Sequence, residues 1–143
     1  INCFTGGLLL ALQLVKDRRC FVCGMENPHG LKLKVVYDGV DQVEAEFMAE
    51  DRYRGWSDYL HDGVLTLIFD EILGWLSRYM GHDAMTARLE VRYRKPVPLG
   101  SRLTFNGVLE REIKGLLDIK LCAKLEDGSM AAEGKGRMMI IDD

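Results

Sequence analysis

Two acidic residues interrupt an otherwise apolar stretch of the chain. Asp70 and Glu71 are the only charged residues between Gly63 and Ser77. Placing an ionised carboxylate in apolar surroundings is costly unless the group has a partner. Burial of this kind raises a carboxyl pKa or leaves the group poorly solvated, which suits a general base or a nucleophile. A structural interpretation is equally open on these grounds, namely a buried acid satisfied by an arginine or by backbone amides.

Three residues with a possible role in oxyanion binding precede this stretch. His61, Asp62 and Gly63 would lie at the start of a helix, where unpaired N–H groups and the positive end of the dipole stabilise negative charge. The absence of a side chain at Gly63 would permit a close approach. The alternative is an ordinary helix start, capped by Ser57, Asp58 or Asp62.

Helical geometry separates these groups from one another. Neighbouring residues on a helix diverge by about 100°, so Asp70 and Glu71 do not face one site as a carboxylate pair. His61 precedes Asp70 by nine residues, which places the two on opposite sides of a helix and roughly 13 Å apart. If both serve one site, two subunits must contribute to it, and the spacing therefore favours a dimer.

One long helix and about six strands are expected to position these residues. Residues 31–37 and 43–47 alternate apolar and polar side chains around Asp38-Gly39, which predicts a hairpin. Residues 60–80 are too long and too apolar for a strand and predict a helix that ends before Gly81. Nearly every face of it is apolar between Val64 and Leu76, so we expect protein to surround the helix. Four further strand patterns follow, at residues 85–94, 103–109, 117–125 and 130–141.

Two of these strands carry informative details. In residues 85–94, period-two alternation puts Met85 and Leu89 on one face. The other face carries Thr86, Arg88, Arg92 and Arg94. In the last strand, Gly134 and Gly136 share the parity of the apolar positions. Missing side chains there leave room for a bulge, a neighbouring subunit or the central helix.

The order of the elements predicts the fold class. A single antiparallel sheet buries a long apolar helix only by curling around it. We therefore expect an α+β hotdog fold, with a curled antiparallel sheet of about six strands around one long central helix. The expected division is an N-terminal segment, residues 1–19, with a short helix, followed by the hotdog domain at residues 20–143. No repeat or linker divides the chain further.

Composition excludes several partners. Lys and Arg number 19 against 22 Asp and Glu, for a net charge of −3, so no basic field attracts nucleic acid or an anionic membrane. The longest apolar run, residues 8–15, contains Gln13 and is far shorter than the roughly 20 residues of a membrane span. It also lacks the features of a secretory signal. We expect a cytoplasmic protein.

The cysteines are expected to be free thiols. Four are present, at positions 3, 20, 23 and 122, without a sign of secretion. Cys20-Phe-Val-Cys23 has the spacing of half a zinc site, but only the scattered His29, His61 and His82 could complete it. We therefore predict no metal.

Longer segments carry a family resemblance. The sequence resembles the hotdog thioesterase superfamily, in particular the branch similar to phenylacetyl-CoA thioesterases, which has His-Gly-Gly at the start of the central helix and Asp nine residues after the His. Here His61-Asp62-Gly63 precedes Asp70 by that spacing. The other matching segments are Cys20-Phe-Val-Cys-Gly24, Asn27-Pro28 with Gly30-Leu31, Gly55-Trp56, Asp70-Glu71 with Gly74-Trp75, and residues 86–100.

The resemblance implies hydrolysis of an acyl- or aryl-CoA thioester between two subunits of a homodimer that assembles further to a tetramer. Asp70 would be general base or nucleophile, and the amide after His61, beside Gly63, would bind the thioester oxygen from the other subunit. Coenzyme A would enter only as part of the substrate, without a cofactor. The remaining expected site residues are Glu71 and Gly55 in support, and Trp56, Thr86, Arg88, Arg92 and Arg94 at the substrate, where the arginines could meet CoA phosphates or form a solvated face.

One departure leaves other functions open. Asp62 stands where the family usually has the first Gly, and an acid side chain that points inward would oppose an oxyanion. The first alternative is therefore a non-catalytic acyl-CoA-binding or sensing protein. The second is a hotdog hydratase, which needs an Asp-His pair on one substrate and is disfavoured by the opposed positions of His61 and Asp70.

Overall fold

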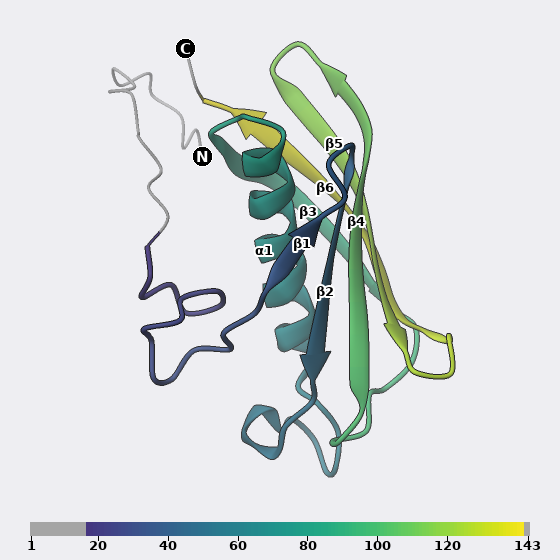
Figure 1. Ribbon diagram of the computed structural model, residues 1–143. Helices are drawn as coiled ribbons and strands as arrows, with labels where there is room; N and C mark the ends of the chain where they lie inside the picture. The colour runs from purple at the N-terminus through teal and green to yellow at the C-terminus, as the bar shows by residue number, and fades with distance from the viewer. Residues whose placement is uncertain (1–16, 142–143) are drawn as a thin grey trace, which may run out of the picture.

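One helix packs lengthwise against a curled, six-stranded antiparallel sheet (Figure 1). The computed structural model describes residues 17–141, and the short helix expected before residue 17 lies outside this range. In chain order the elements are β1 (Val35–Tyr37), β2 (Gln42–Met48), a 3-10 turn (Asp51–Tyr53), α1 (Asp62–Tyr79), β3 (Ala84–Tyr93), β4 (Arg102–Ile113), β5 (Leu116–Leu125) and β6 (Met130–Ile140). The predicted α+β hotdog arrangement is confirmed.

The strand order places the first strand after the helix at one edge of the sheet. Neighbouring strands follow the order β1-β2-β4-β5-β6-β3, and each pair is antiparallel. β3 pairs only with β6 among the described strands, whereas β1 closes the opposite edge. The connection that contains α1 therefore leads from β2, near one edge of the sheet, to β3 at the opposite edge.

Local signals explain the bounds of α1. His61 is the N-cap, and its Nδ1 accepts a hydrogen bond from the Gly63 N–H at 2.9 Å. The alternative in which Ser57, Asp58 or Asp62 caps the helix is wrong in its choice of residue, because the His61 imidazole nitrogen accepts the capping hydrogen bond. At the other end the chain turns at Gly81, whose φ of 88° suits glycine.

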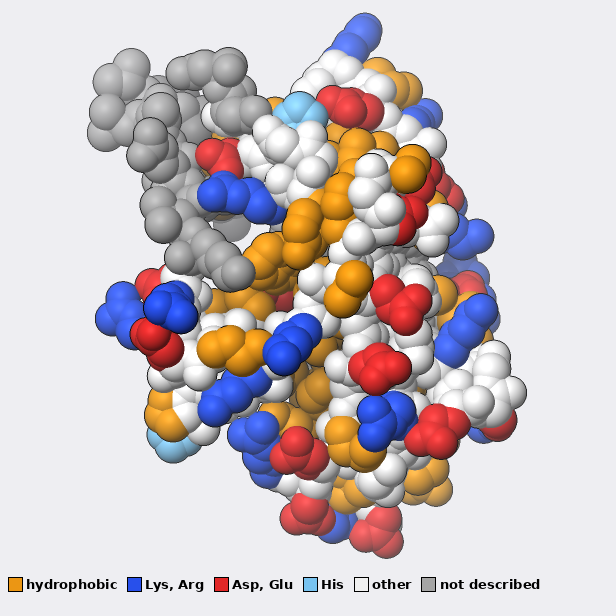
Figure 2. Space-filling view, viewed as in Figure 1, with side chains coloured by type: hydrophobic (Ala, Val, Ile, Leu, Met, Phe, Trp, Pro, Cys, Tyr) orange, Lys and Arg blue, Asp and Glu red, His pale blue; other side chains and the backbone are white. Residues whose placement is uncertain are grey.

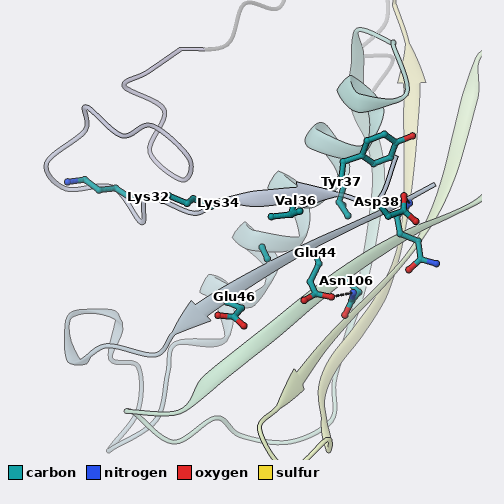
Figure 3. A pocket seen from close by; sticks show the side chains of 11 residues that line it. Lys32, Lys34, Val36, Tyr37, Asp38, Glu44, Glu46 and Asn106 are labelled. Carbon is teal, nitrogen blue, oxygen red and sulfur yellow. Dashed lines mark hydrogen bonds between the residues drawn. The ribbon is translucent and has the colours of Figure 1, made fainter. Parts of the chain in front are cut away.

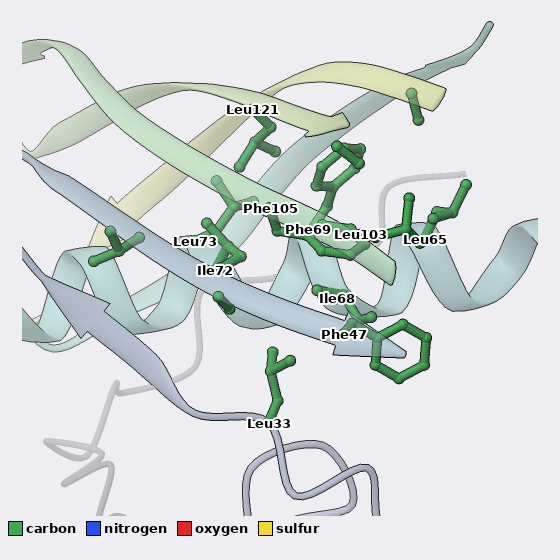
Figure 4. Close-up of a cluster of buried hydrophobic side chains, with 14 of the residues drawn as sticks. Leu33, Phe47, Leu65, Ile68, Phe69, Ile72, Leu73, Leu103, Phe105 and Leu121 are labelled. Atoms are coloured by element: carbon green, nitrogen blue, oxygen red, sulfur yellow. The ribbon is translucent and has the colours of Figure 1, made fainter. Parts of the chain in front are cut away.

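The apolar face of α1 supplies the centre of the core. Figure 4 shows Ile68, Phe69, Ile72 and Leu73 directed at side chains of the sheet. Phe69 meets Phe105 of β4 edge to face, with ring centroids 5.6 Å apart. Burying one such side chain contributes roughly 1.5–3 kcal/mol, so this face fixes the rotation of the helix about its axis.

Two glycines of β6 allow close packing, as their position in the sequence predicted. A Cβ at Gly136 would lie 2.4 Å from Leu73 of α1, and one at Gly134 would lie 2.6 Å from the Glu90 carbonyl of β3. Of the three predicted occupants of this space, the central helix is therefore confirmed, together with the neighbouring strand.

A β-bulge changes which face of β3 Thr86 occupies. The register with β6 shifts between Thr86 and Arg88, so that Thr86 pairs with Met138 and Leu89 pairs with Gly136. Met138 and Gly136 both face α1. The predicted clean alternation is therefore wrong at this point, because an extra residue in a bulge resets the parity of a strand.

The segment before β1 differs from the predicted strand. Only Val35–Tyr37 joins β2, whereas the backbone N–H groups of Leu31 and Leu33 bond to the carbonyls of Phe21 (3.0 Å) and Val22 (2.9 Å). Residues 31–34 therefore pair with an N-terminal turn instead of the sheet, and Lys32 interrupts the extended backbone with a φ of 53°.

The visible surface carries both signs of charge. Figure 2 shows apolar side chains gathered near α1 and β1, with acidic and basic side chains interspersed around them. Within residues 17–141, no helix has the length and hydropathy needed to cross a membrane.

Candidate active site

Asp70 lies on a flank of α1 that is open to solvent in the single chain. Thr86 of β3 donates a hydrogen bond from Oγ1 to Asp70 Oδ1 at 2.7 Å, and both residues are exposed. The sequence predicts at least one of the two acids in or near apolar surroundings; in the single chain this describes the half-buried Glu71 and not Asp70. Within residues 17–141 Asp70 has no ion pair, so the alternative of an acid neutralised by an arginine does not describe it either.

The open flank corrects the expectation that protein surrounds the helix on every side. Gly63, Asp70, Gly74 and Arg78 follow one another along this flank, and all are exposed. Their spacing of four or seven residues puts them on one side of a helix. The apolar residues that suggested enclosure occupy the opposite face and its margins, while glycine leaves the flank bare.

The helix start is a tightly built turn. A Cβ at Gly55 would lie 2.8 Å from His61 Cα and 3.1 Å from His61 N, so Gly55 lets the two segments touch. His61 accepts two hydrogen bonds, one from the Gly63 N–H at its Nδ1 and one from the Val64 N–H at its carbonyl oxygen. Within the described residues the Asp62 N–H, the amide after His61, has no acceptor, as expected in a first helical turn.

The structure separates the helix start from Asp70. His61 is the N-cap, and Asp70 lies in the middle of α1. Nine residues of helix amount to roughly 13 Å of rise, in agreement with the sequence prediction. One chain therefore does not bring an oxyanion-binding amide and the carboxylate to the same point.

The three predicted phosphate-binding arginines occupy the outer face of β3. Arg88 pairs with Glu90 at 3.2 Å and Arg94 with Glu133 at 2.7 Å, and Arg92 has the same parity. Thr86 alone among the expected substrate-binding residues of this strand contacts Asp70.

Trp56 occupies the loop between the 3-10 turn and α1. Its side chain is 89% exposed. The structure places it near the helix start in the chain and gives it no contact with Asp70.

Glu71, next to Asp70, points into different surroundings. It is half-buried, and its Oε1 accepts a hydrogen bond from Trp75 Nε1 at 3.0 Å and lies 3.9 Å from Cys20 Sγ. Burial raises the pKa of the Cys23 thiol, and hydrogen bonds with Glu71 and Cys20 act in the same direction. Sequence reasoning noticed the C-x-x-C spacing but not its proximity to this acid.

A surface depression lies away from Asp70. It measures about 640 Å³ and lies over the edge formed by β1 and β2 (Figure 3). Glu44 and Asn106 cross it with a hydrogen bond of 3.3 Å. It contains none of the predicted site residues, and the chemistry of a carboxylate with an oriented hydroxyl therefore belongs to the helix flank.

Solved structures share this fold. A thioesterase superfamily protein is 27% identical, with a TM-score of 0.77 over 85% of this chain and 60% of that chain. The Escherichia coli PaaI protein of the phenylacetic acid degradation operon is 14% identical, with a TM-score of 0.72 over 78% of this chain and 81% of that chain. 

A hypothetical thioesterase from Streptococcus pneumoniae has been solved in several forms. Its structure with coenzyme A is 17% identical, with a TM-score of 0.72 over 76% of this chain and 87% of that chain. Two variants, each with a TM-score of 0.73 and 15% identity, replace by alanine an aspartate and a threonine sixteen positions further on; they cover 78% of this chain and 92% and 91% of theirs.

A family model also matches the chain directly. The model describes the thioesterase superfamily and matches residues 58–131, more than half of the sequence, including α1, β3, β4 and β5. The predicted family resemblance is thereby confirmed, and the chain belongs to the thioesterase superfamily.

Proposed function

We propose that this protein hydrolyses the thioester of an acyl-CoA, with Asp70 as the catalytic carboxylate. The observation that carries the proposal is the 2.7 Å hydrogen bond from Thr86 Oγ1 to an Asp70 that is exposed on the helix flank. The bond fixes one carboxylate oxygen and leaves the other for chemistry. An exposed and oriented carboxylate is what attack at a thioester carbon requires.

Two routes use the same groups. As a general base, Asp70 takes a proton from water while the water oxygen bonds to the thioester carbon; the C–S bond then breaks, and the proton passes to the CoA thiolate. As a nucleophile, Asp70 forms an acyl-carboxylate anhydride and releases CoA, and water cleaves the anhydride. Thr86 orients the carboxylate in both routes.

The Streptococcus pneumoniae protein supports this pairing of residues. In that protein an aspartate and a threonine sixteen positions later were each replaced by alanine, and Asp70 and Thr86 have the same separation. That protein was also solved with coenzyme A. Both facts favour a coenzyme A thioester as the substrate here.

A second subunit is proposed to complete the site. β3 is a ten-residue edge strand, and an open edge of that length is normally covered. Pairing of two copies along β3 would bring the Asp62 amide of one subunit toward Asp70 of the other. It would also cover the flank at Gly63 and Gly74, where the absence of side chains leaves room.

A non-catalytic acyl-CoA-binding protein is the second candidate, and Asp62 favours it. This residue is exposed in the first turn of α1, beside the amide proposed to bind the oxyanion. A carboxylate there weakens the stabilisation of developing negative charge. Asp62→Gly is therefore expected to raise turnover.

The first experiment measures thiol release from short, long and aromatic acyl-CoAs. Wild type is compared with Asp70→Asn and Asp62→Gly. Turnover by wild type that Asp70→Asn abolishes supports the enzyme and ranks its acyl groups. Tight binding of the esters without release by any of the three proteins contradicts hydrolysis and supports the binding protein.

Subunit complementation tests the shared site. Gly63→Val should destroy the helix start, because a Cβ at this position would already lie 2.9 Å from His61 Nδ1. Mixed dimers of Gly63→Val and Asp70→Asn chains contain one intact site each, so refolding them together should restore about a quarter of wild-type activity. Absence of recovery, although light scattering shows mixed dimers, would contradict the shared site.

A further inference from the structure

The side of α1 next to the Asp70 flank, about 100° around the helix axis, holds a cluster of soft and acidic donors. Cys20 Sγ, Cys23 Sγ and a Glu71 carboxylate oxygen all lie within 4.8 Å of one another. The two thiols come from the N-terminal turn and the acid from the helix, 51 residues beyond Cys20. The proposed hydrolysis uses none of these groups.

The backbone holds the two cysteines in a defined turn. The Gly24 N–H bonds to the Cys20 carbonyl at 2.9 Å, and a Cβ at Gly24 would lie 2.4 Å from Cys20 N. Val22, between the cysteines, is buried in the core. Its carbonyl accepts the Leu33 N–H at 2.9 Å. This turn is therefore anchored on both sides and directs its thiols toward α1 without help from a ligand.

The acid is oriented as well. Trp75 Nε1 donates to Glu71 Oε1 at 3.0 Å, which fixes the carboxylate. Hydrogen-bonded carboxylates of this kind are typical of metal sites, where the outer partner holds the ligand in place.

The cluster borders an open cavity of about 470 Å³. Asp17 and Asp83 add negative groups to its lining, and Arg78 and His82 add basic ones. A bound divalent cation favours the thiolate form of a coordinating cysteine.

We propose that Cys20, Cys23 and Glu71 bind one zinc ion, with the fourth coordination position open to the cavity. Two thiolates with a carboxylate suit the borderline-soft Zn²⁺, and C-x-x-C is a usual zinc spacing. Tetrahedral bonds of 2.0–2.3 Å set ligand atoms about 3.3–3.8 Å apart. The donors, which lie within 4.8 Å of one another, therefore need to approach by at most about 1.0–1.5 Å.

This proposal departs from the sequence prediction of no metal. That prediction looked for a second cysteine or histidine pair along the chain, whereas the fold supplies the third ligand from α1. On binding, each of the two thiols gives its proton to solvent, because the thiolate is the form that coordinates the metal. The ion would fasten the N-terminal turn to α1 beside Asp70.

Metal titration of the full chain tests the proposal. Reduced, metal-stripped protein should bind one Zn²⁺ per chain, and Co²⁺ in its place should show the charge-transfer absorption of two thiolates. Cys20→Ser and Cys23→Ser should each weaken zinc binding by more than about 100-fold, and Trp75→Phe by roughly 10- to 100-fold. These measurements need no enzymatic activity and stand apart from the proposed hydrolysis.

The chain offers a matched control. The double variant Cys3→Ser/Cys122→Ser keeps only Cys20 and Cys23 and should bind zinc as wild type does. Circular dichroism checks that each variant is folded. Absence of zinc binding by reduced wild type, its loss in the double variant, or a Cys20–Cys23 disulfide with no zinc binding after reduction would each overturn the assignment.

Discussion

Asp70 and Glu71 are consecutive residues of one helix, yet they meet two different environments. Asp70 is exposed beside β3, where one threonine hydroxyl is its hydrogen-bond partner at 2.7 Å. Glu71 is half-buried between the indole of Trp75 and the thiols of the N-terminal turn. A rotation of about 100° around the helix axis separates them.

The difference shows that position around the axis, rather than residue type, assigns the chemistry. Six buried apolar side chains on the sheet-facing side of α1 set its rotation. Once that rotation is fixed, one acid faces a surface that a substrate or a second subunit can reach. The other faces the Cys20 and Cys23 thiols of its own chain. The two acids should therefore respond differently to the same loss of charge.

The largest expected effect is the loss of activity in Asp70→Asn. The amide accepts no proton from water and is a poor nucleophile, so kcat/KM should fall by about 10²–10⁴-fold. The melting temperature should change little, because the side chain is exposed. Steady-state thiol release and thermal unfolding, measured on the same preparations, check both statements.

Glu71→Gln is the matched control for this prediction. It removes the neighbouring charge, and kcat/KM should stay within tenfold of wild type. An equal loss of activity in the two variants would contradict the separation of roles between the two flanks.

Thr86→Val should have the next largest effect. The change keeps the shape of the side chain but removes the donor to Asp70, and a hydrogen bond to a charged group contributes about 1.5–3 kcal/mol. We expect kcat to fall roughly 10- to 100-fold, with Thr86→Ser close to wild type. If Thr86→Ser and Thr86→Val were equally impaired, the hydroxyl would not be the group that matters.

The contact between Asp70 and Thr86 also shows where sequence reasoning stops. The helix and six strands follow from periodicity, and the choice of Asp70 as a candidate follows from a lone pair of acids in apolar sequence. The partner of Asp70 does not, because alternation put Thr86 on the outer face. A single bulged residue between Thr86 and Arg88 reverses that assignment, and no turn-forming residue announces it.

The Glu71 environment was hidden for a related reason. Cys20 of the C-x-x-C turn and Glu71 of the helix are 51 residues apart in the sequence. Only the packing of the N-terminal turn over α1 brings them together. Likewise, composition suggested an enclosed helix, because glycine and apolar residues were counted without knowing which side faced the sheet. Patterns along the chain predict elements well, but contacts between distant elements depend on rotation and register.

Gly136→Ala tests how firmly the sheet fixes the rotation of α1. The new Cβ would lie 2.4 Å from the Leu73 side chain, and overpacking of this kind typically costs about 1–3 kcal/mol of unfolding free energy. Urea denaturation of the variant should show a lower midpoint. A midpoint equal to that of wild type would indicate that the helix shifts easily.

Gly74→Ala provides the comparison on the open flank. No atom lies within 4 Å of a Cβ at this position, and alanine is favoured over glycine in a helix by roughly 0.8–1.0 kcal/mol. If the flank is open in solution, thermal unfolding should show a more stable protein. A decrease instead would support the proposed second subunit on this flank.

The smallest expected effect concerns Asp118, on the sheet face that points away from both acids. Hydrogen bonds from Arg137 and then Arg111 hold the pKa of this carboxyl well below its ordinary value. The ion pairs therefore stabilise the fold fully above the unfolded pKa of about 3.9, and this contribution disappears as the pH falls through the lower folded pKa.

Wild type should lose stability on acidification through this range more steeply than Asp118→Asn. The two arginines are 58% and 41% exposed, so high salt should reduce the difference. Urea unfolding from pH 5 to pH 3 measures it, while kcat/KM at neutral pH should be unchanged, because the residue contacts neither flank of α1. Equal slopes for the two proteins would mean that the ion pairs add nothing, and a loss of activity in Asp118→Asn would connect the outer face to the site.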